Sequence, residues 1–198
     1  MADEVVRHNV ANGSVTERWY DGARDDLVLL APHGGSIEPS TAAQVKAIAT
    51  GTGLPAWTCT GHSQTDTSAF TRFHVTSADI SPNEYPLLAH AYELSPARAV
   101  SFHGMSNDGI KVGGRAQTAV KQHVCAALQE ALPSSVMIES VSWGPYCGIT
   151  RANIVNEVTA SGESGIQIEQ SRTVRDNHGE TVSQTVVTAL DELRVAVS

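Results

Sequence analysis

The chain has 198 residues, a length typical of one domain, and its 41% apolar and 17% charged residues form an ordinary globular mixture. The formal net charge is −8 and no basic cluster is present, so nucleic acid is not an expected partner. No apolar run approaches the roughly 18 residues of a membrane span, and the acidic start lacks the pattern of a signal peptide. We therefore predict one domain over residues 1–198 with no membrane partner, expected in the cytoplasm. The sequence leaves release by another route and the oligomeric state open.

The first half of the chain opens with a strand that stops abruptly. In chain order we predict strand 26–31, helix 40–50, strand 54–60 and helix 83–94. The first run, Asp-Leu-Val-Leu-Leu-Ala, lacks clean alternation of polar and apolar residues, which is typical of strands buried on both faces of a mostly parallel sheet. In the first helix Thr41 and Gln44 have the spacing of a capping box, and in the second Pro86 must lie within the first turn.

The second half continues this alternation of strands and helices. In chain order we predict strand 97–102, helix 115–132, strand 135–141, strand 165–169 and a closing helix 179–196. Both helices carry apolar residues at helical spacing. Strands that alternate with helices predict an α/β fold, here a single domain with a mixed, mostly parallel sheet flanked by helices.

Three of the predicted strands end on ionisable residues, which are His33, His103 and Glu169. In open α/β sheets ligands bind beyond the carboxyl ends of the strands, so these three side chains are expected to converge on one face. Folding alone does not require ionisable groups at such ends, because burying them unpaired is costly. The sequence therefore predicts a polar site at this edge of the sheet.

A possible metal-binding set follows from the spacing around the first of these strand ends. Glu38 lies five residues after His33, across a loop with two glycines that allow sharp turns. His33, His103 and Glu38 would form a His₂Glu set, which leaves the fourth tetrahedral position of zinc for water. Glu169 could then accept a proton from that water. Each residue taken singly is more often structural, so the residues alone leave both interpretations open.

Five short blocks extend this pattern over most of the chain, in order from about residue 27 to residue 175. They are Ala-Pro-His-Gly-Gly-Ser-Ile-Glu at 31–38, Phe-His-Val-Thr-Ser at 73–77, Val-Ser-Phe-His-Gly at 100–104, Val-Gly-Gly at 112–114 and Gly-Ile-Gln-Ile-Glu at 165–169. Together they resemble the phage-type poly-γ-glutamate hydrolase family. The first and last blocks are specific as a pair, whereas the shorter pieces would be weak by themselves.

The resemblance implies a zinc carboxypeptidase-like fold and the hydrolysis of γ-amide bonds between glutamates. It also implies that Zn²⁺ is held by His33, Glu38 and His103 and that Glu169 is the catalytic base. Ordinary zinc carboxypeptidases space their first ligand pair as HxxE, whereas this chain has HxxxxE. The longer spacing suits the poly-γ-glutamate hydrolases and argues against an ordinary C-terminal carboxypeptidase.

Several other polar residues are candidates for substrate binding. A γ-glutamyl substrate carries free α-carboxylates, and arginine binds carboxylates in a bidentate geometry, so we single out Arg115 and Arg172. Either could instead be a surface arginine in solvent, and Arg172 could also pair with Glu169 or with a neighbouring acid. His74 could contact substrate or orient a metal ligand, or be an internal histidine. Asn153 and Asn156 could bind substrate, although capping a turn is the favoured interpretation.

The sequence thus predicts a zinc-dependent hydrolase that cleaves γ-glutamyl amide bonds of poly-γ-glutamate or γ-glutamyl peptides. Two alternatives stay open. The first is a related metal-dependent amidase or deacylase that acts on small acyl-amino acids. The second is a non-catalytic module that binds glutamyl polymer, although a general base beside a complete ligand set argues against it.

Overall fold

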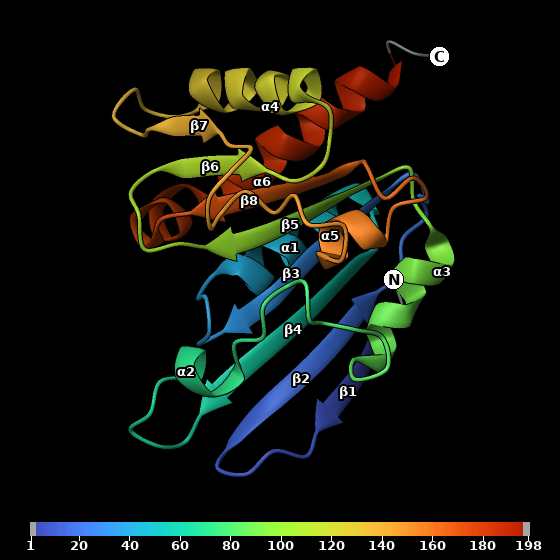
Figure 1. Ribbon diagram of the computed structural model, residues 1–198, viewed down its shortest axis with the longest axis vertical. Coiled ribbons are helices and arrows are strands. Elements are labelled where there is room, and N and C mark those ends of the chain that lie inside the picture. The colour runs from blue at the N-terminus through green and yellow to red at the C-terminus, as the bar shows by residue number, and fades with distance from the viewer. Residues whose placement is uncertain (1–2, 196–198) are drawn as a thin grey trace.

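One mixed sheet runs through the protein, and the computed structural model describes residues 3–195 (Figure 1). Within these residues the sheet has eight strands in the order β1-β2-β4-β3-β5-β8-β6-β7. The strands are β1 (Asp3–His8), β2 (Gly13–Tyr20), β3 (Leu27–Gly35), β4 (Ala56–Ser63), β5 (Arg98–Gly104), β6 (Ile110–Gly113), β7 (Ile138–Ser140) and β8 (Gly165–Gln170). Strands β4, β3, β5 and β8 are parallel, β1 and β2 add an antiparallel edge, and β6 runs antiparallel to β8.

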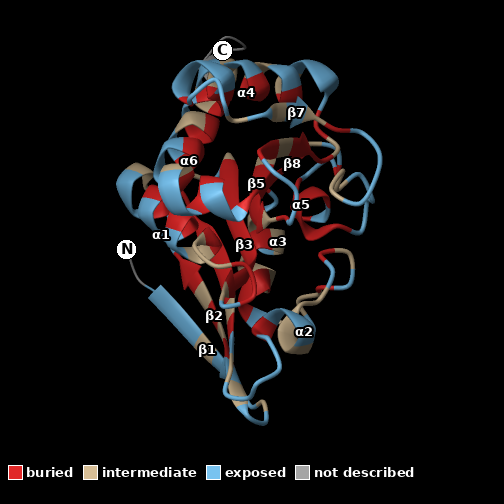
Figure 2. Cartoon of the chain, turned by 90° about the vertical axis from the view of Figure 1, so that its left-hand side faces the viewer, coloured by how far each residue is buried: buried red, intermediate tan, exposed pale blue. Residues whose placement is uncertain are grey.

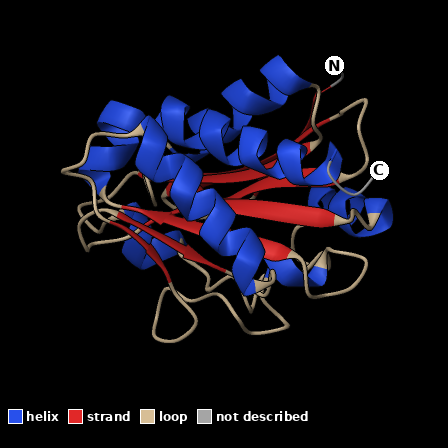
Figure 3. Ribbon diagram, turned by 90° about the horizontal axis from the view of Figure 1, so that it is seen from above, coloured by secondary structure: helices blue, strands red, loops and turns tan. Residues whose placement is uncertain are grey.

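Helices cover both faces of the sheet (Figure 3). They are α1 (Thr41–Thr52), α2 (Ala69–Phe73), the 3-10 helix η1 (Pro86–Leu88), α3 (Ala89–Leu94), α4 (Thr118–Ala131), α5 (Ile154–Glu157) and α6 (Arg172–Val195). The longer helices α1, α4 and α6 pack together on one face, and η1, α3 and α5 pack on the other. No helix within residues 3–195 is long and apolar enough to cross a membrane. The predicted α/β architecture with a mostly parallel sheet is confirmed.

The central strands are buried on both faces, as their continuous apolar runs predicted (Figure 2). In β3, Leu27 and Leu29 face the cluster of α1, α4 and α6, whereas Val28 and Leu30 face the cluster of α3 and α5. A strand alternates its side chains between faces, so burial on both sides leaves no polar position until the strand ends.

Strand β3 is longer than predicted, and this changes the place of His33. The strand continues to Gly35, and its register against β4 shifts between Ala31 and Gly34. Ala31 pairs with Thr58 and Gly34 with Thr60, so two residues of β3 oppose one residue of β4, as in a β-bulge. The bulge contains Pro32, which has no N–H to give to a ladder. His33 therefore lies inside an irregular strand rather than in a loop after it.

Several predicted details were wrong. Thr41 and Gln44 form no capping box: the hydroxyl of Thr41 donates to the carbonyl of Glu38, and the amide of Gln44 pairs with that of Gln170. Residue 83 does not start a helix, because only Pro86–Leu88 and the residues after them are helical.

The two ends of the chain also differ from the prediction. The closing helix begins at Arg172 rather than at Gly179, and its predicted last residue, Ala196, lies outside the described residues. The antiparallel strands β1 and β2 and the short strand β6 were not predicted. β1 is mostly exposed, so its residues lack the continuous apolar run that identified the central strands.

The turn after β6 allows a direct test of the packing between β6 and β8. Gly114 has φ +91°, and a Cβ there would collide with the carbonyl of Gly165. We expect Gly114→Ala to lower the free energy of unfolding by at least about 2 kcal/mol. The cost of a positive φ for alanine and the cost of the steric collision with Gly165 add. Urea unfolding measures this. Gly51→Ala is the matched control: it lies in α1 with open space around it and should raise stability by up to about 1 kcal/mol.

Candidate metal centre

Four ionisable side chains meet at the carboxyl ends of three neighbouring parallel strands. His33 comes from β3, His103 from β5 and Glu169 from β8, and the sheet register pairs His103 with Glu169. Glu38 lies in the turn between β3 and α1, where its N–H donates to the carbonyl of His33 at 2.7 Å. All four are buried, with 3 to 6% of each residue exposed. The convergence expected from the sequence is therefore present.

The donor atoms of three of these residues have the spacing of metal ligands. The Nδ1 atoms of His33 and His103 are 3.2 Å apart. The carboxylate oxygens of Glu38 lie 3.3 Å from Nδ1 of His33 and 3.6 Å from Nδ1 of His103. Tetrahedral zinc with bonds of about 2.0–2.1 Å places its ligand atoms about 3.3 Å apart. These three side chains could hold a metal ion without large movement.

Hydrogen bonds to backbone groups orient the side chains of His33 and Glu38. Nε2 of His33 donates to the carbonyl of Val75 at 2.7 Å, because a carbonyl only accepts, and Nδ1 is the nitrogen that faces Glu38. The N–H of Gly104 donates to Oε2 of Glu38 at 2.8 Å. Nε2 of His103 is buried with no hydrogen-bond partner among the described residues.

The charge states of Glu38 and His103 suit a cation. Burial by itself would raise the pKa of the Glu38 carboxyl, but hydrogen bonds with His103 and His33 outweigh it and hold the pKa well below its usual range. Burial lowers the pKa of His103 despite the opposing effect of Glu38, which keeps that imidazole neutral. An ionised carboxylate and a neutral imidazole are the forms that bind metals.

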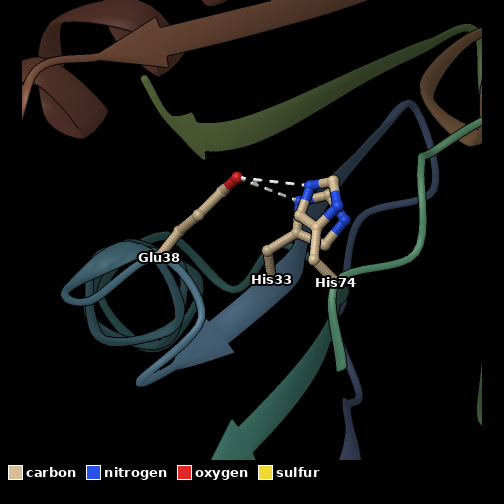
Figure 4. Close-up of side chains that lie close together, drawn as sticks. All are labelled: His33, Glu38 and His74. Carbon is tan, nitrogen blue, oxygen red and sulfur yellow. Dashed lines mark ion pairs between the residues drawn. The ribbon is translucent and has the colours of Figure 1, made fainter. Parts of the chain in front are cut away.

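His74 is a further candidate ligand, and its imidazole lies beside that of His33 (Figure 4). The ring centroids are 4.2 Å apart, and Nε2 of His74 is 3.8 Å from Oε1 of Glu38. His33, Glu38 and His74 therefore also form a group that could hold a metal ion. We favour His103 as the third ligand, because its Nδ1 lies closer to Glu38 and its side chain is only 4% exposed against 27% for His74.

Glu169 lies in the same cavity and is held by a chain of side-chain amides. The amide of Asn153 donates to Oε1 of Gln167 at 2.8 Å, and Nε2 of Gln167 donates to Oε1 of Glu169 at 2.8 Å. Burial, and secondly the negative charge of Glu38, raise the pKa of Glu169 well above its usual value. A carboxylate with a raised pKa takes up a proton more readily, which is a property of a general base. Asn153 also caps α5, as the sequence favoured.

The site opens into a cavity of about 700 Å³. One wall is segment 74–78 and another is segment 144–150. The amide of Asn156 fixes the second wall by donating to the carbonyls of Gly148 at 2.7 Å and Thr150 at 2.9 Å. The buried ammonium of Lys121 lies 3.4 Å from the carbonyl of Val141, just before this wall. Neighbouring helices therefore hold the loop that faces the strand ends.

The two arginines singled out from the sequence lie outside this cavity. Arg115 pairs with Glu163, and Arg172 pairs with Asp176 one turn along α6. Their role in substrate binding stays a prediction. Arg175 lines the cavity instead, and no pattern in the sequence distinguished it from the other arginines. A helix predicted from residue 172, rather than from Gly179, would have placed Arg175 on the same face as the buried Val182 and Val186, seven and eleven residues further on.

A family model described as poly-gamma-glutamate hydrolase matches residues 6–188 of the chain. No curated protein matches this chain significantly. Among solved structures, that of a bacteriophage poly-gamma-glutamate hydrolase has a TM-score of 0.72 at 21% identity, covering 96% of this chain and 93% of that one.

Two further structures share the fold at lower similarity. The gene product Atu2144 from Agrobacterium tumefaciens has a TM-score of 0.54 at 11% identity, covering 85% of this chain and 90% of its own. A cytosol aminopeptidase from Coxiella burnetii has a TM-score of 0.54 at 9% identity, covering 96% of this chain and 61% of its own. At these identities the likeness extends to the fold alone.

Metal binding by two variants separates the candidate third ligands. We expect His103→Ala to lose stoichiometric metal, because the ligand set then keeps only His33 and Glu38. His74→Ala should retain it, with affinity lowered by at most about 10- to 100-fold, as for a neighbouring residue that supports the ligands without ligating. Equilibrium dialysis followed by elemental analysis measures both. The reverse result would assign the third ligand to His74.

The metal-free protein should lose stability in a defined acid range. Burial, and secondly the charge of His33, lower the pKa of His74 from 6.5 to about 4. The unfolded chain then binds more protons than the folded one between these values, so stability falls as the pH drops from 6.5 to 4. We expect His74→Gln to remove about 1–3 kcal/mol of that fall. Urea unfolding with chelator at several pH values measures it, and an unchanged pH dependence would contradict the expectation.

Proposed function

The chain belongs to the poly-γ-glutamate hydrolase family, and we propose that it hydrolyses γ-glutamyl amide bonds of poly-γ-glutamate or γ-glutamyl peptides with a zinc ion. The observation that carries this proposal is the juxtaposition of a His₂Glu donor set with a separate buried carboxylate, Glu169, in one cavity. A binding module has no need for a carboxyl of raised pKa next to a metal centre.

His33, Glu38 and His103 would hold the zinc. Two imidazole nitrogens and one carboxylate form a donor set typical of catalytic zinc sites, which keep one position open. When bound, zinc would polarise the amide carbonyl and lower the pKa of a water molecule to about 7. The hydrogen bonds from His33 to Val75 and from Gly104 to Glu38 keep the three donor atoms facing one another.

Glu169 would move the proton. Gln167 holds Oε1 of Glu169, so Oε2 is the atom that would take a proton from the attacking water and pass it to the leaving nitrogen. The raised pKa of Glu169 suits this exchange, because a weakly basic carboxylate would not retain the proton long enough to deliver it. Asn153 and Gln167 keep the carboxylate from turning away.

Replacement of the general base should stop hydrolysis without loss of metal. We expect Glu169→Gln to lower kcat on poly-γ-glutamate by about 10²–10⁴-fold, because the amide cannot accept the proton, while zinc stays at the parent level. Product release followed by chromatography and metal analysis measure both. Glu93→Gln, an exposed carboxylate on α3, is the matched control and should keep the parent activity.

Other outcomes of this experiment identify the alternatives. Zinc-bound Glu169→Gln that hydrolyses as fast as the parent would reject the mechanism. A parent protein that binds the polymer but never cleaves it would be a binding module. A parent that cleaves only small acyl-amino acids would be an amidase or deacylase. Chelator should abolish the activity and added zinc restore it.

A further inference from the structure

The cavity of the metal centre contains a single basic side chain of the Arg or Lys type among its described lining residues, which is Arg175. Arg175 lies in the first turns of α6 and is only 8% exposed. The chain carries a net charge of −8, and two carboxylates, Glu38 and Glu169, already lie in the same cavity. A buried arginine at this place is the one permanent positive charge that the described part of the cavity offers.

The guanidinium of Arg175 lies directly beside the metal centre. A Cβ on Gly104 would lie 2.5 Å from its Cζ and 2.7 Å from both Nη atoms, so the guanidinium lies against the backbone that follows His103. Nη1 donates to the carbonyl of Pro39 at 2.6 Å, immediately after Glu38. Two segments that carry metal ligands thus fix the position of this cation.

Most of the donors of Arg175 are not used within the described residues. A guanidinium has five N–H groups, and one hydrogen bond from Arg175, to Pro39, is present. Nε is buried without a hydrogen-bond partner. Burial also lowers the pKa of Arg175, which reflects incomplete compensation of its charge by the neighbouring carboxylates. A buried cation with free donors that faces a cavity is suited to bind an anion.

The proposed substrate supplies such an anion near the reacting bond. In a γ-linked glutamyl chain, the carbon bonded to the scissile nitrogen carries a free α-carboxylate. That carboxylate follows the scissile nitrogen by one carbon, so it must lie close to the metal centre when the bond is in place. Because the protein is acidic overall, long-range attraction of a polyanion is not available, and a local cation is needed.

We propose that Arg175 binds the α-carboxylate of the glutamyl unit on the leaving side of the cleaved bond and so selects γ-glutamyl chains over neutral amides. The inference rests on the proposed hydrolase function. Arg175 then acts as a specificity-determining residue, whereas Arg115 and Arg172 lie outside the cavity with acidic partners of their own.

Two oligomers test this role. One is a short γ-linked glutamate oligomer with free α-carboxylates, and the other is the same chain with α-carboxamides. We expect Arg175→Met to lower kcat/KM for the carboxylate oligomer by about 10- to 100-fold, mainly through KM. The carboxamide oligomer should change by less than about 3-fold, since it has no charge for Arg175 to pair with. Arg175→Lys, which keeps the charge but not the planar fork, should fall between parent and Arg175→Met.

Matched controls separate binding from a structural effect. Arg7→Met removes the same charge from an exposed position on β1 and should leave both oligomers unaffected. Zinc content and thermal unfolding are measured on every variant. Loss of zinc in Arg175→Lys as well as in Arg175→Met would show that Arg175 only supports the turn at Pro39, and would overturn the proposal.

The remaining outcomes are equally decisive. If Arg175→Met retains zinc but loses kcat/KM equally on both oligomers, Arg175 contacts the carbonyl oxygen rather than the carboxylate. If kcat/KM is unchanged on both oligomers, Arg175 does not contact the substrate. If the parent cleaves neither oligomer, the proposed hydrolase function fails, and this is seen before any Arg175 variant is made. If the parent cleaves both equally well, only the proposed selectivity fails.

Discussion

The carboxylate of Glu38 lies buried between the imidazoles of His33 and His103 and the N–H of Gly104, and the surrounding structure depends on this contact. A buried carboxylate without partners would cost several kcal/mol, so the strands and the turn that supply these partners must keep their relative positions. The same three donor atoms are close enough to hold a metal ion. Folding and the proposed chemistry therefore require the same arrangement of β3, β5 and the turn before α1.

The bulge in β3 links this arrangement to the sheet. A regular strand would continue the alternation of β3 past Ala31 and keep His33 in ladder register with β4. The extra residue at Pro32 bends the strand and turns the chain toward Glu38, whose N–H then reaches the carbonyl of His33. A bulge beside a functional site re-aims a side chain while the strand on either side stays paired.

Much of the fold and part of the site could be predicted from local sequence. Strands β3, β5 and β8 are almost wholly buried, so apolar residues dominate them, although Ser101 and Gln167 interrupt the runs of β5 and β8, and an ionisable residue stands toward each carboxyl end. Because carboxyl ends of neighbouring parallel strands share one edge, His103 and Glu169 could be expected together from their positions alone. The exposed edge strand β1 has no buried apolar run that would identify it. It pairs with β2 through main-chain hydrogen bonds, which residues of almost any type can form.

The sequence by itself determined which strands are central and which ionisable residues stand at their ends. A strand buried on both faces must be rich in apolar residues, and the direction of the chain shows which of its ends is the carboxyl end. Only the tertiary structure decided which cation enters the cavity. Arg172 and Arg175 lie one helical turn apart, and the first pairs with Asp176 at the surface whereas the second lies against Gly104. Their difference depends on where α6 begins and how it packs on β5 and the turn after β3, which are contacts between segments far apart in the chain.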